Sequence, residues 1–372
     1  MNTAINQWYH IDNSNDVDSP ALVVYPQRVR SNIQEAVAMI GDVQRFRPHV
    51  KTNKCKEAVM LMIEEGISKF KCATIAEAEM MGMCQAKDVL FAYQPVGPKL
   101  HRFIEVIKKY PATKYSCLTD NIAAAGAMSD AFTKNGLQVA VYIDVNVGQN
   151  RTGIVPEHAK ELYLHCSKLA GVRPVGLHAY DGHIRHIDLD ARQQQCDECF
   201  EKVMAVKTAI IQAGLSEPVI VAGGSPTFSI HAKRKEIECS PGTFVYWDKG
   251  YAALCPEQHF LPAALVIARV ISLPSGNTLC IDLGHKSIAA ENEIGRRIYF
   301  LNAPELKAVS QSEEHLVVEA EAGHGYKIGD LLYGLPFHVC PTIALYERAL
   351  TVYDHIANGE WKTIARDRKI TI

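Results

Sequence analysis

Short apolar runs alternate with amphipathic stretches along most of the chain. From about residue 20, each β-rich run is followed by a segment with apolar residues at helical spacing, which is typical of parallel β/α units. The expected strands are ALVVY leading in, then RFRPHV, KFKCAT, VLFAYQ, KYSCLT, QVAVYIDV, PVGLHAY, PVIVAGG and EIECSP. Counted from RFRPHV, the eight repeats predict a closed eight-stranded β/α barrel of the TIM type. An open, doubly wound sheet is the alternative if one strand is false or missed.

The pattern changes after residue 255. Segments such as ALVIARVISL, HLVVEAE and ALTVYD alternate apolar and polar residues between turns rich in Gly, Pro, Asn and Asp. We therefore predict a β/α barrel over residues 20–255 and a C-terminal all-β domain over residues 256–372, with residues 1–19 joining the second domain.

Composition and charge exclude several classes of function. The hydrophobic content of 48% suits a globular chain, and the formal net charge of -2 includes no long run of one sign. Neither a nucleic acid nor a membrane is therefore expected as a partner. The sequence MNTAINQWYHIDNSND lacks a secretion signal, which predicts a cytoplasmic protein. The 11 cysteines are scattered, so most should be reduced and buried, including Cys196 and Cys199 in a helical pattern.

Polar residues follow the expected barrel strands, where enzymes of this architecture place their active sites. In RFRPHVK, Arg45, Arg47, His49 and Lys51 alternate with apolar residues and so share one face of an extended strand. Lys51 ends the strand, and the neighbouring cations disfavour the charged form of its amine, which would make it nucleophilic. A solvated loop lysine is the alternative.

Two glycine-containing loops follow the seventh and eighth expected strands, where such barrels bind phosphate. One loop contains Gly223, Gly224 and Ser225, and the other contains Pro241, Gly242 and Thr243. Glycine lets backbone N–H groups approach an anion, and the two hydroxyl side chains add further donors. A phosphate site opposite Lys51 predicts pyridoxal phosphate, held as a Schiff base on that lysine.

A set of motifs resembles a known family. RPHVKTNKCKE, YIDVNVGQNRTGI, GLHAYDGHIRH, VAGGSPTF, ECSPGTFVYWD and FHVCPT follow one another in order. Together they resemble the D-threonine aldolase and D-serine dehydratase family, pyridoxal-phosphate enzymes of the alanine-racemase-like fold (fold type III). The resemblance implies a Schiff base on Lys51, with Arg151, Tyr180, Gly224 and Thr243 around the cofactor ring and phosphate. It also implies a small amino-acid substrate and a homodimer.

The resemblance further implies a divalent metal ion. The family binds this ion through His-x-Asp in the aldolases or His-x-Cys in the dehydratases, and the matching pair in this sequence is His338 and Cys340. On a strand, residues two apart face the same way, so both side chains could reach one ion. An imidazole with a thiolate favours zinc, with manganese and magnesium as alternatives.

The motifs point to a lyase for β-hydroxy D-amino acids, but they favour two different reactions. AYDGHIRH resembles the aldolase pattern, whose final histidine, here His186, is the implied base for retro-aldol cleavage to glycine and an aldehyde. Cys340 instead resembles the dehydratases, which release keto acid and ammonia. We favour the aldolase because the base decides which bond breaks, with His183 as a competitor for that role. An amino-acid racemase and a cofactor carrier without turnover are further alternatives, and neither requires the metal.

Overall fold

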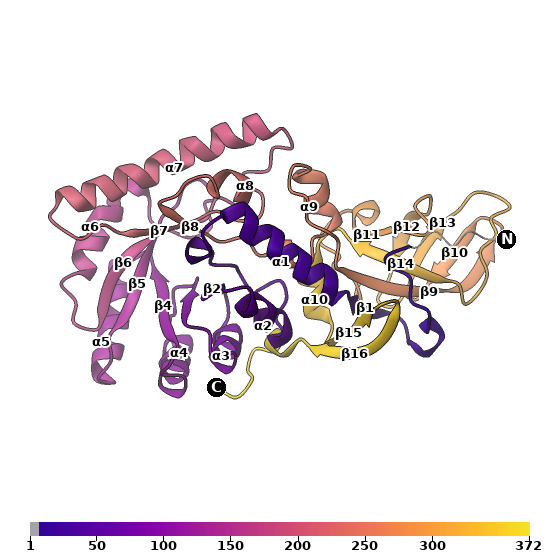
Figure 1. Cartoon of the computed structure of the whole chain (residues 1–372), viewed down its shortest axis with the longest axis horizontal. Coiled ribbons are helices and arrows are strands. Elements are labelled where there is room, and N and C mark those ends of the chain that lie inside the picture. The colour runs from indigo at the N-terminus through magenta and orange to yellow at the C-terminus, as the bar shows by residue number, and fades with distance from the viewer. Residues whose placement is uncertain (1–6) are drawn as a thin grey trace.

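The parallel strands form one sheet at one end of the molecule (Figure 1). The structure is a computed structural model that describes residues 7–372. Within these residues, seven strands pair in the order of the sequence, each parallel to the next. They are β2 (Lys69–Cys72), β3 (Asp88–Phe91), β4 (Lys114–Thr119), β5 (Val139–Asp144), β6 (Val172–Ala179), β7 (Val219–Ala222) and β8 (Ile237–Cys239).

Helices alternate with these strands, as the sequence pattern predicts. They are α1 (Pro26–Ile40), α2 (Lys56–Glu64), α3 (Ile75–Met83), α4 (Pro98–Lys109), α5 (Ile122–Lys134), α6 (Pro156–Cys166), α7 (Leu189–Gln212) and α8 (Phe228–His231). Several begin where a short polar side chain accepts a hydrogen bond from a free backbone N–H group. The side chain of Thr74 caps α3, that of Asn121 caps α5 and that of Asp188 caps α7.

The segment RFRPHV connects β8 to β2 without forming a regular strand. Phe46 forms an isolated bridge with Cys239 of β8, and His49 forms one with Lys71 of β2. Pro48 between them has no N–H group, so this position cannot donate to a neighbouring strand. The carbonyl oxygen of Pro48 still accepts a bond from the Lys71 N–H at 2.9 Å. The expected eight-stranded sheet is therefore not confirmed: seven strands pair regularly in residues 7–372, and RFRPHV bridges the remaining gap through isolated pairs.

A second sheet of nine strands, counted within residues 7–372, lies beside the first (Figure 1). Its main path is β12-β13-β10-β9-β1-β15-β16, and β14 joins β11 to β9. The strands are β1 (Ala21–Val24), β9 (Ala264–Ser275), β10 (Thr278–Ile281), β11 (Ile298–Phe300), β12 (Lys307–Gln311), β13 (Leu316–Glu319), β14 (Leu331–Pro336), β15 (Arg348–Tyr353) and β16 (Ile356–Lys362). The helices α9 (Lys249–Leu254) and α10 (Val339–Leu345) lie between the two sheets in the view of Figure 1.

The N-terminal part of the chain contributes to this second sheet. β1 pairs antiparallel with β9 and parallel with β15, so ALVVY lies outside the barrel domain in which the boundary at residue 20 placed it. Of the expected contribution of residues 1–19, residues 1–6 lie outside the described residues. Within the remainder, the N–H of Ile11 donates to the hydroxyl of Tyr333 on β14 at 3.1 Å. No helix in residues 7–372 is long and apolar enough to cross a membrane.

A buried ion-pair network closes the end of the barrel at which the strands begin. Nε of Arg47 donates to Glu238 at 2.6 Å, and its Nη1 donates to Asp88 at 2.6 Å. The Arg47 side chain is 1% exposed. Lys69 also pairs with Glu238. The alternation in RFRPHVK therefore points Arg47 into the barrel, but at the end opposite to the one that Lys51 reaches.

Replacing Arg47 with Met should lower the free energy of unfolding by about 3–5 kcal/mol, because Asp88 and Glu238 would lose their shared counter-charge. Urea unfolding followed by circular dichroism measures this change. Arg30→Ala is the control, since the Arg30–Glu64 pair is exposed and should contribute less than about 1 kcal/mol. Equal losses in the two variants would contradict a structural role for the buried network.

Candidate active site

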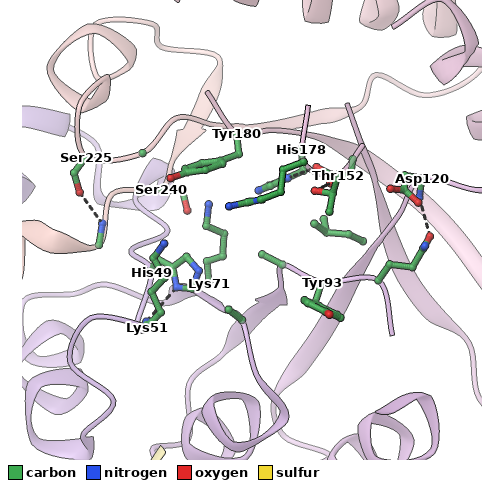
Figure 2. A pocket seen from close by; sticks show the side chains of 18 of the residues that line it. His49, Lys51, Lys71, Tyr93, Asp120, Thr152, His178, Tyr180, Ser225 and Ser240 are labelled. Atoms are coloured by element: carbon green, nitrogen blue, oxygen red, sulfur yellow. Dashed lines mark hydrogen bonds and ion pairs between the residues drawn. The ribbon is translucent and has the colours of Figure 1, made fainter. Parts of the chain in front are cut away.

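A cavity of about 620 Å³ opens at the end of the barrel where the strands finish (Figure 2). Its lining includes most of the residues that the sequence places around a cofactor. These are Lys51, Arg151, Tyr180, Gly224, Ser225, Gly242 and Thr243. The polar residues Tyr93, Gln94, Thr119 and Asp120, which follow the early strands, line it as well. The expected ring of polar groups therefore converges on one space.

Lys51 and Arg151 both face the ring of Tyr180. Nζ of Lys51 lies 5.9 Å from the centre of the ring, and Cζ of Arg151 lies 5.0 Å from it. The N–H of Lys51 donates to Nδ1 of His49 at 3.2 Å, which fixes the turn that follows RFRPHV. Burial, assisted by the charges of Lys51 and Lys71, holds the pKa of His49 well below its usual range, so this ring is neutral and can accept that bond.

The two glycine loops meet at Ser225. Its Oγ accepts bonds from the N–H of Thr243 at 3.1 Å and from the N–H of Gly242 at 3.4 Å. Gly224 is held against Tyr180, where a Cβ atom would lie only 2.9 Å from the ring. Gly223 adopts a φ of +80° and is not part of the cavity lining, so it shapes the turn instead of facing the space.

Lys71 is the main functional candidate that the sequence analysis missed. It lies on β2, its side chain lines the cavity, and its Nζ is 5.8 Å from the centre of the Tyr180 ring. Burial and the charge of Lys51 lower the pKa of Lys71 to about 7. The signal in the sequence is the alternation in KFKCAT, which places Lys71 on the inward face of its strand. The expectation that active-site residues follow the strands does not include a residue within one.

His178 and Asp144 form a buried pair in the cavity wall. Nδ1–H of His178 donates to Asp144 at 2.7 Å, and the hydroxyl of Thr152 donates to the same carboxylate at 2.8 Å. Burial lowers the pKa of His178, although the bond to Asp144 acts in the opposite direction. Within the described residues, Nε2 of His178 is buried without a hydrogen-bond partner. A neutral imidazole thus presents a free lone pair next to the cavity.

The two loop histidines occupy different environments. His186 lies between β6 and α7 with an exposed side chain, and it does not line the cavity. The ring of His183 packs against Gly148, and its Nε2 lies 3.8 Å from the sulfur of Cys199. His186 is thus the more accessible of the two, and its catalytic role stays a prediction.

His338 and Cys340 lie at the start of α10 and not on a strand, so the strand-based reason for pairing them is wrong. The two side chains nevertheless lie close enough for each to shift the pKa of the other. Sγ of Cys340 lies 3.1 Å from the hydroxyl oxygen of Thr52 and 3.7 Å from that of Thr243, next to the cavity. Nδ1 of His338 is bonded to Glu291.

The same contacts polarise this pair. Burial alone would raise the pKa of the Cys340 thiol, but the neighbouring His338 and the charge of Lys51 lower it below its usual value. Burial would lower the pKa of His338, yet the neighbouring Cys340 and the bond with Glu291 raise it to about 9. Sulfur and imidazole therefore stand together as a potential donor set for a soft metal ion.

A second group of potential metal ligands lies outside the cavity lining. Ligand atoms of Asp181, Cys196 and His231 all lie within 4.8 Å of one another. Both ring nitrogens of His231 already have partners, since its Nε2–H donates to Asp181 at 2.8 Å and its Nδ1 accepts from Arg234 at 2.5 Å. Thr227 also donates to Asp181 at 2.9 Å. A cationic Arg234 beside the imidazole favours a structural hydrogen-bond network here.

Two family models match consecutive parts of the chain. The alanine racemase, N-terminal domain, matches residues 24–249, and the serine dehydratase domain matches residues 263–352. The chain belongs to the alanine racemase N-terminal domain family. The seven-stranded parallel sheet with its β-rich partner domain is the corresponding alanine-racemase-like fold.

Within this alanine-racemase-like family, the chain is similar to lyases over nearly its whole length. It is 28% identical over 359 residues to D-threonine aldolase of Arthrobacter sp, covering 94% of this chain and 93% of the relative. It is 24% identical over 358 residues to D-threo-3-hydroxyaspartate dehydratase of Delftia sp. (strain HT23), covering 89% and 93%. The crystal structure of D-threonine aldolase from Filomicrobium marinum superposes with a TM-score of 0.88 at 25% identity, covering 94% of this chain and 96% of that one.

Proposed function

We propose that the protein is a pyridoxal-phosphate- and divalent-metal-dependent lyase that cleaves β-hydroxy D-amino acids to glycine and an aldehyde, as D-threonine aldolase does. The observation that carries this proposal is the placement of the Lys51 amine in one cavity with Tyr180 and the joined loops of Ser225 and Thr243. The likeness to D-threonine aldolase over 94% of the chain supports the choice of reaction.

The residues of the cavity suit pyridoxal phosphate. Lys51 supplies a primary amine for the aldehyde, and Arg151 supplies a cation beside the ring of Tyr180. The loops joined at Ser225 bring the N–H groups of Gly242 and Thr243 and the hydroxyls of Ser225 and Thr243 to the cavity wall. A phosphate would take the place of the Ser225 Oγ as acceptor of these N–H groups. When bound, the cofactor supplies an electron-accepting ring that weakens the bonds at Cα of an attached amino acid.

The side chains of this chain would then decide which bond breaks. In the aldolase reaction, His186 takes the proton from the β-hydroxyl group of the substrate, and the bond between Cα and Cβ breaks to release the aldehyde. This role requires the loop between β6 and α7 to turn the exposed ring of His186 inward. In the alternative dehydration, Lys51 takes the proton from Cα and the hydroxyl group leaves.

His338 and Cys340 would hold the divalent ion, with zinc favoured by the thiolate and imidazole donors. Their position beside Thr52 and Thr243 places them at the edge of the cavity. Solved forms of a D-threo-3-hydroxyaspartate dehydratase include a histidine-to-alanine variant and a metal-free cysteine-to-alanine variant, substituted two positions apart. His338 and Cys340 have the same spacing, and this observation favours D-serine-dehydratase-like elimination as the second candidate function.

The first experiment measures products. Purified protein is incubated with D-threonine and D-serine, and glycine with acetaldehyde is assayed against keto acid with ammonia. We expect glycine and acetaldehyde from D-threonine, and loss of both the activity and the visible absorbance of bound cofactor in Lys51→Ala. Lys54→Ala is the matched control, because Lys54 is paired with Glu77. Ammonia and keto acid as products would establish the dehydratase, and a visible band retained in Lys51→Ala would exclude Lys51 as the anchor.

The metal site is tested by elemental analysis of the purified protein. One divalent ion per chain is expected in the wild type, and His338→Ala or Cys340→Ala should lose it while retaining bound pyridoxal phosphate. Cys280→Ala controls for the loss of a partly exposed thiol. Loss of the ion in Cys196→Ala, with retention in Cys340→Ala, would assign it instead to the cluster around Asp181.

The catalytic base is tested with the two loop histidines. His186→Ala should slow aldehyde release by roughly 10²–10⁴-fold without weakening cofactor binding, because it removes only a proton acceptor. Acetaldehyde release under single-turnover conditions gives this rate, and absorbance spectra report the bound cofactor. A normal rate in His186→Ala together with a slow rate in His183→Ala would identify His183 as the base.

A further inference from the structure

Lys71 is a buried lysine whose amine projects into the cavity (Figure 2). The residue is 2% exposed, and its Nζ lies 5.8 Å from the centre of the Tyr180 ring. In residues 7–372, burial and longer-range charges act on this amine, but no side chain forms a hydrogen bond with it. An amine that is shielded from bulk solvent and faces a cavity without an acceptor among these residues indicates a site built for an anionic ligand.

Two cations and two carboxylates act on Lys71 from a distance, and within residues 7–372 neither carboxylate is bonded to its amine. Lys51 and Arg47 act on it as cations, and His49 and His178 are neighbouring rings whose pKa values its own charge lowers. Asp144 already accepts bonds from His178 and Thr152, and Asp181 lies in the network of His231. The missing partner must therefore come from the bound molecule.

The order of the strands indicates which part of that molecule reaches Lys71. The pyridoxal ring carries its groups in a fixed order. The carbon that bears the phosphate arm is followed by the aldehyde carbon, the hydroxyl carbon, the methyl carbon and then the ring nitrogen. The elements around the barrel have a fixed order, which can be compared with the order of these ring atoms. It begins with the loops after β7 and β8 and continues with the segment ending at Lys51, then β2, the next strands and β5. With the phosphate at the loops and the aldehyde at Lys51, the hydroxyl is directed to β2, where Lys71 lies. The ring nitrogen, opposite the aldehyde, is directed to Arg151 beyond β5, which agrees with the place of that cation.

We propose that Lys71 is the charged partner of the phenolic oxygen of pyridoxal phosphate, an inference that rests on the proposed function. An ammonium group bonded to a phenolate stabilises the ionised oxygen and keeps the lysine charged despite its burial. The bond also fixes the tilt of the ring relative to Tyr180. Lys51 then remains the amine that bonds to the aldehyde, and the two lysines have different tasks.

The test compares Lys71→Met with Lys71→Arg, which keeps the charge, and with Lys69→Met, which removes a lysine from the same strand but near Glu238. The visible spectrum of each protein with bound pyridoxal phosphate is titrated against pH. Loss of the cation should raise the pH midpoint of the spectral change by about 1–3 units in Lys71→Met, since an adjacent positive charge favours the deprotonated form. The affinity for pyridoxal phosphate, measured by equilibrium dialysis, should fall by about 10- to 100-fold. Lys71→Arg should keep a midpoint and an affinity close to those of the wild type, and Lys69→Met should change neither quantity.

The outcomes separate this inference from the proposed function. Borohydride reduction followed by peptide mass spectrometry should place the cofactor on residue 51 in the wild type and in Lys71→Met. If the cofactor is attached there but Lys71→Met retains the wild-type midpoint and affinity, the role of Lys71 is rejected and the proposed function stands. Attachment to residue 71 in the wild type would overturn the division of tasks, and failure of the wild type to bind pyridoxal phosphate would reject both proposals.

Discussion

The backbone pairing of one irregular segment holds the candidate site together. On one side, the N–H of Arg47 donates to Cys239 of β8 and the N–H of His49 donates to Pro241 just beyond it. On the other side, the N–H of Val50 donates to Lys71 of β2, and the N–H of Lys71 donates to Pro48. These bonds are short and directed to two strands at once, so the segment has almost no freedom to slide. Because Lys51 is the next residue along the chain, its amine is delivered to the cavity by the same bonds that close the barrel. Backbone held from both sides fixes the point from which the flexible side chain of Lys51 enters the cavity.

Along this segment, the side chains that point into the barrel differ in role from one end to the other. Arg47 is fully paired with acids at the closed end, His49 is neutral in the middle, and Lys51 reaches the open end. β2 shows the same change, since Lys69 is paired with Glu238 whereas Lys71 forms no ion pair within residues 7–372. The cations Arg47 and Lys69 are neutralised where the strands begin, which keeps that end of the barrel rigid. The amines of Lys51 and Lys71 lie at the other end, in the cavity.

The sequence pattern was sufficient for the repeated β/α order, the change to an all-β domain and the glycine loops of the cavity, because hydrophobic periodicity and glycine turns are local signals. The expectation that Arg151 and Tyr180 lie in the same cavity came from the family resemblance. It failed where tertiary context decides. RFRPHV alternates like a strand, but Pro48 limits its pairing to isolated bridges. FHVCPT resembles a strand as well, yet Pro341 suits the first turn of a helix, and α10 begins there. Lys69 and Lys71 are indistinguishable in KFKCAT, because only the position of Glu238 across the barrel neutralises one of them.

The central place of β1 between β9 and β15 has a consequence for how the chain is made. A ribosome releases this strand first, but its partners emerge only after the whole barrel has been synthesised, so the nascent barrel carries an unpaired apolar strand for most of translation. The last partner, β15, also follows the helix that brings Cys340 beside Thr52. The rim of the cavity is therefore completed only after α10 has been synthesised, well after the strands of the barrel, so a chain that still lacks this helix does not present the finished cavity.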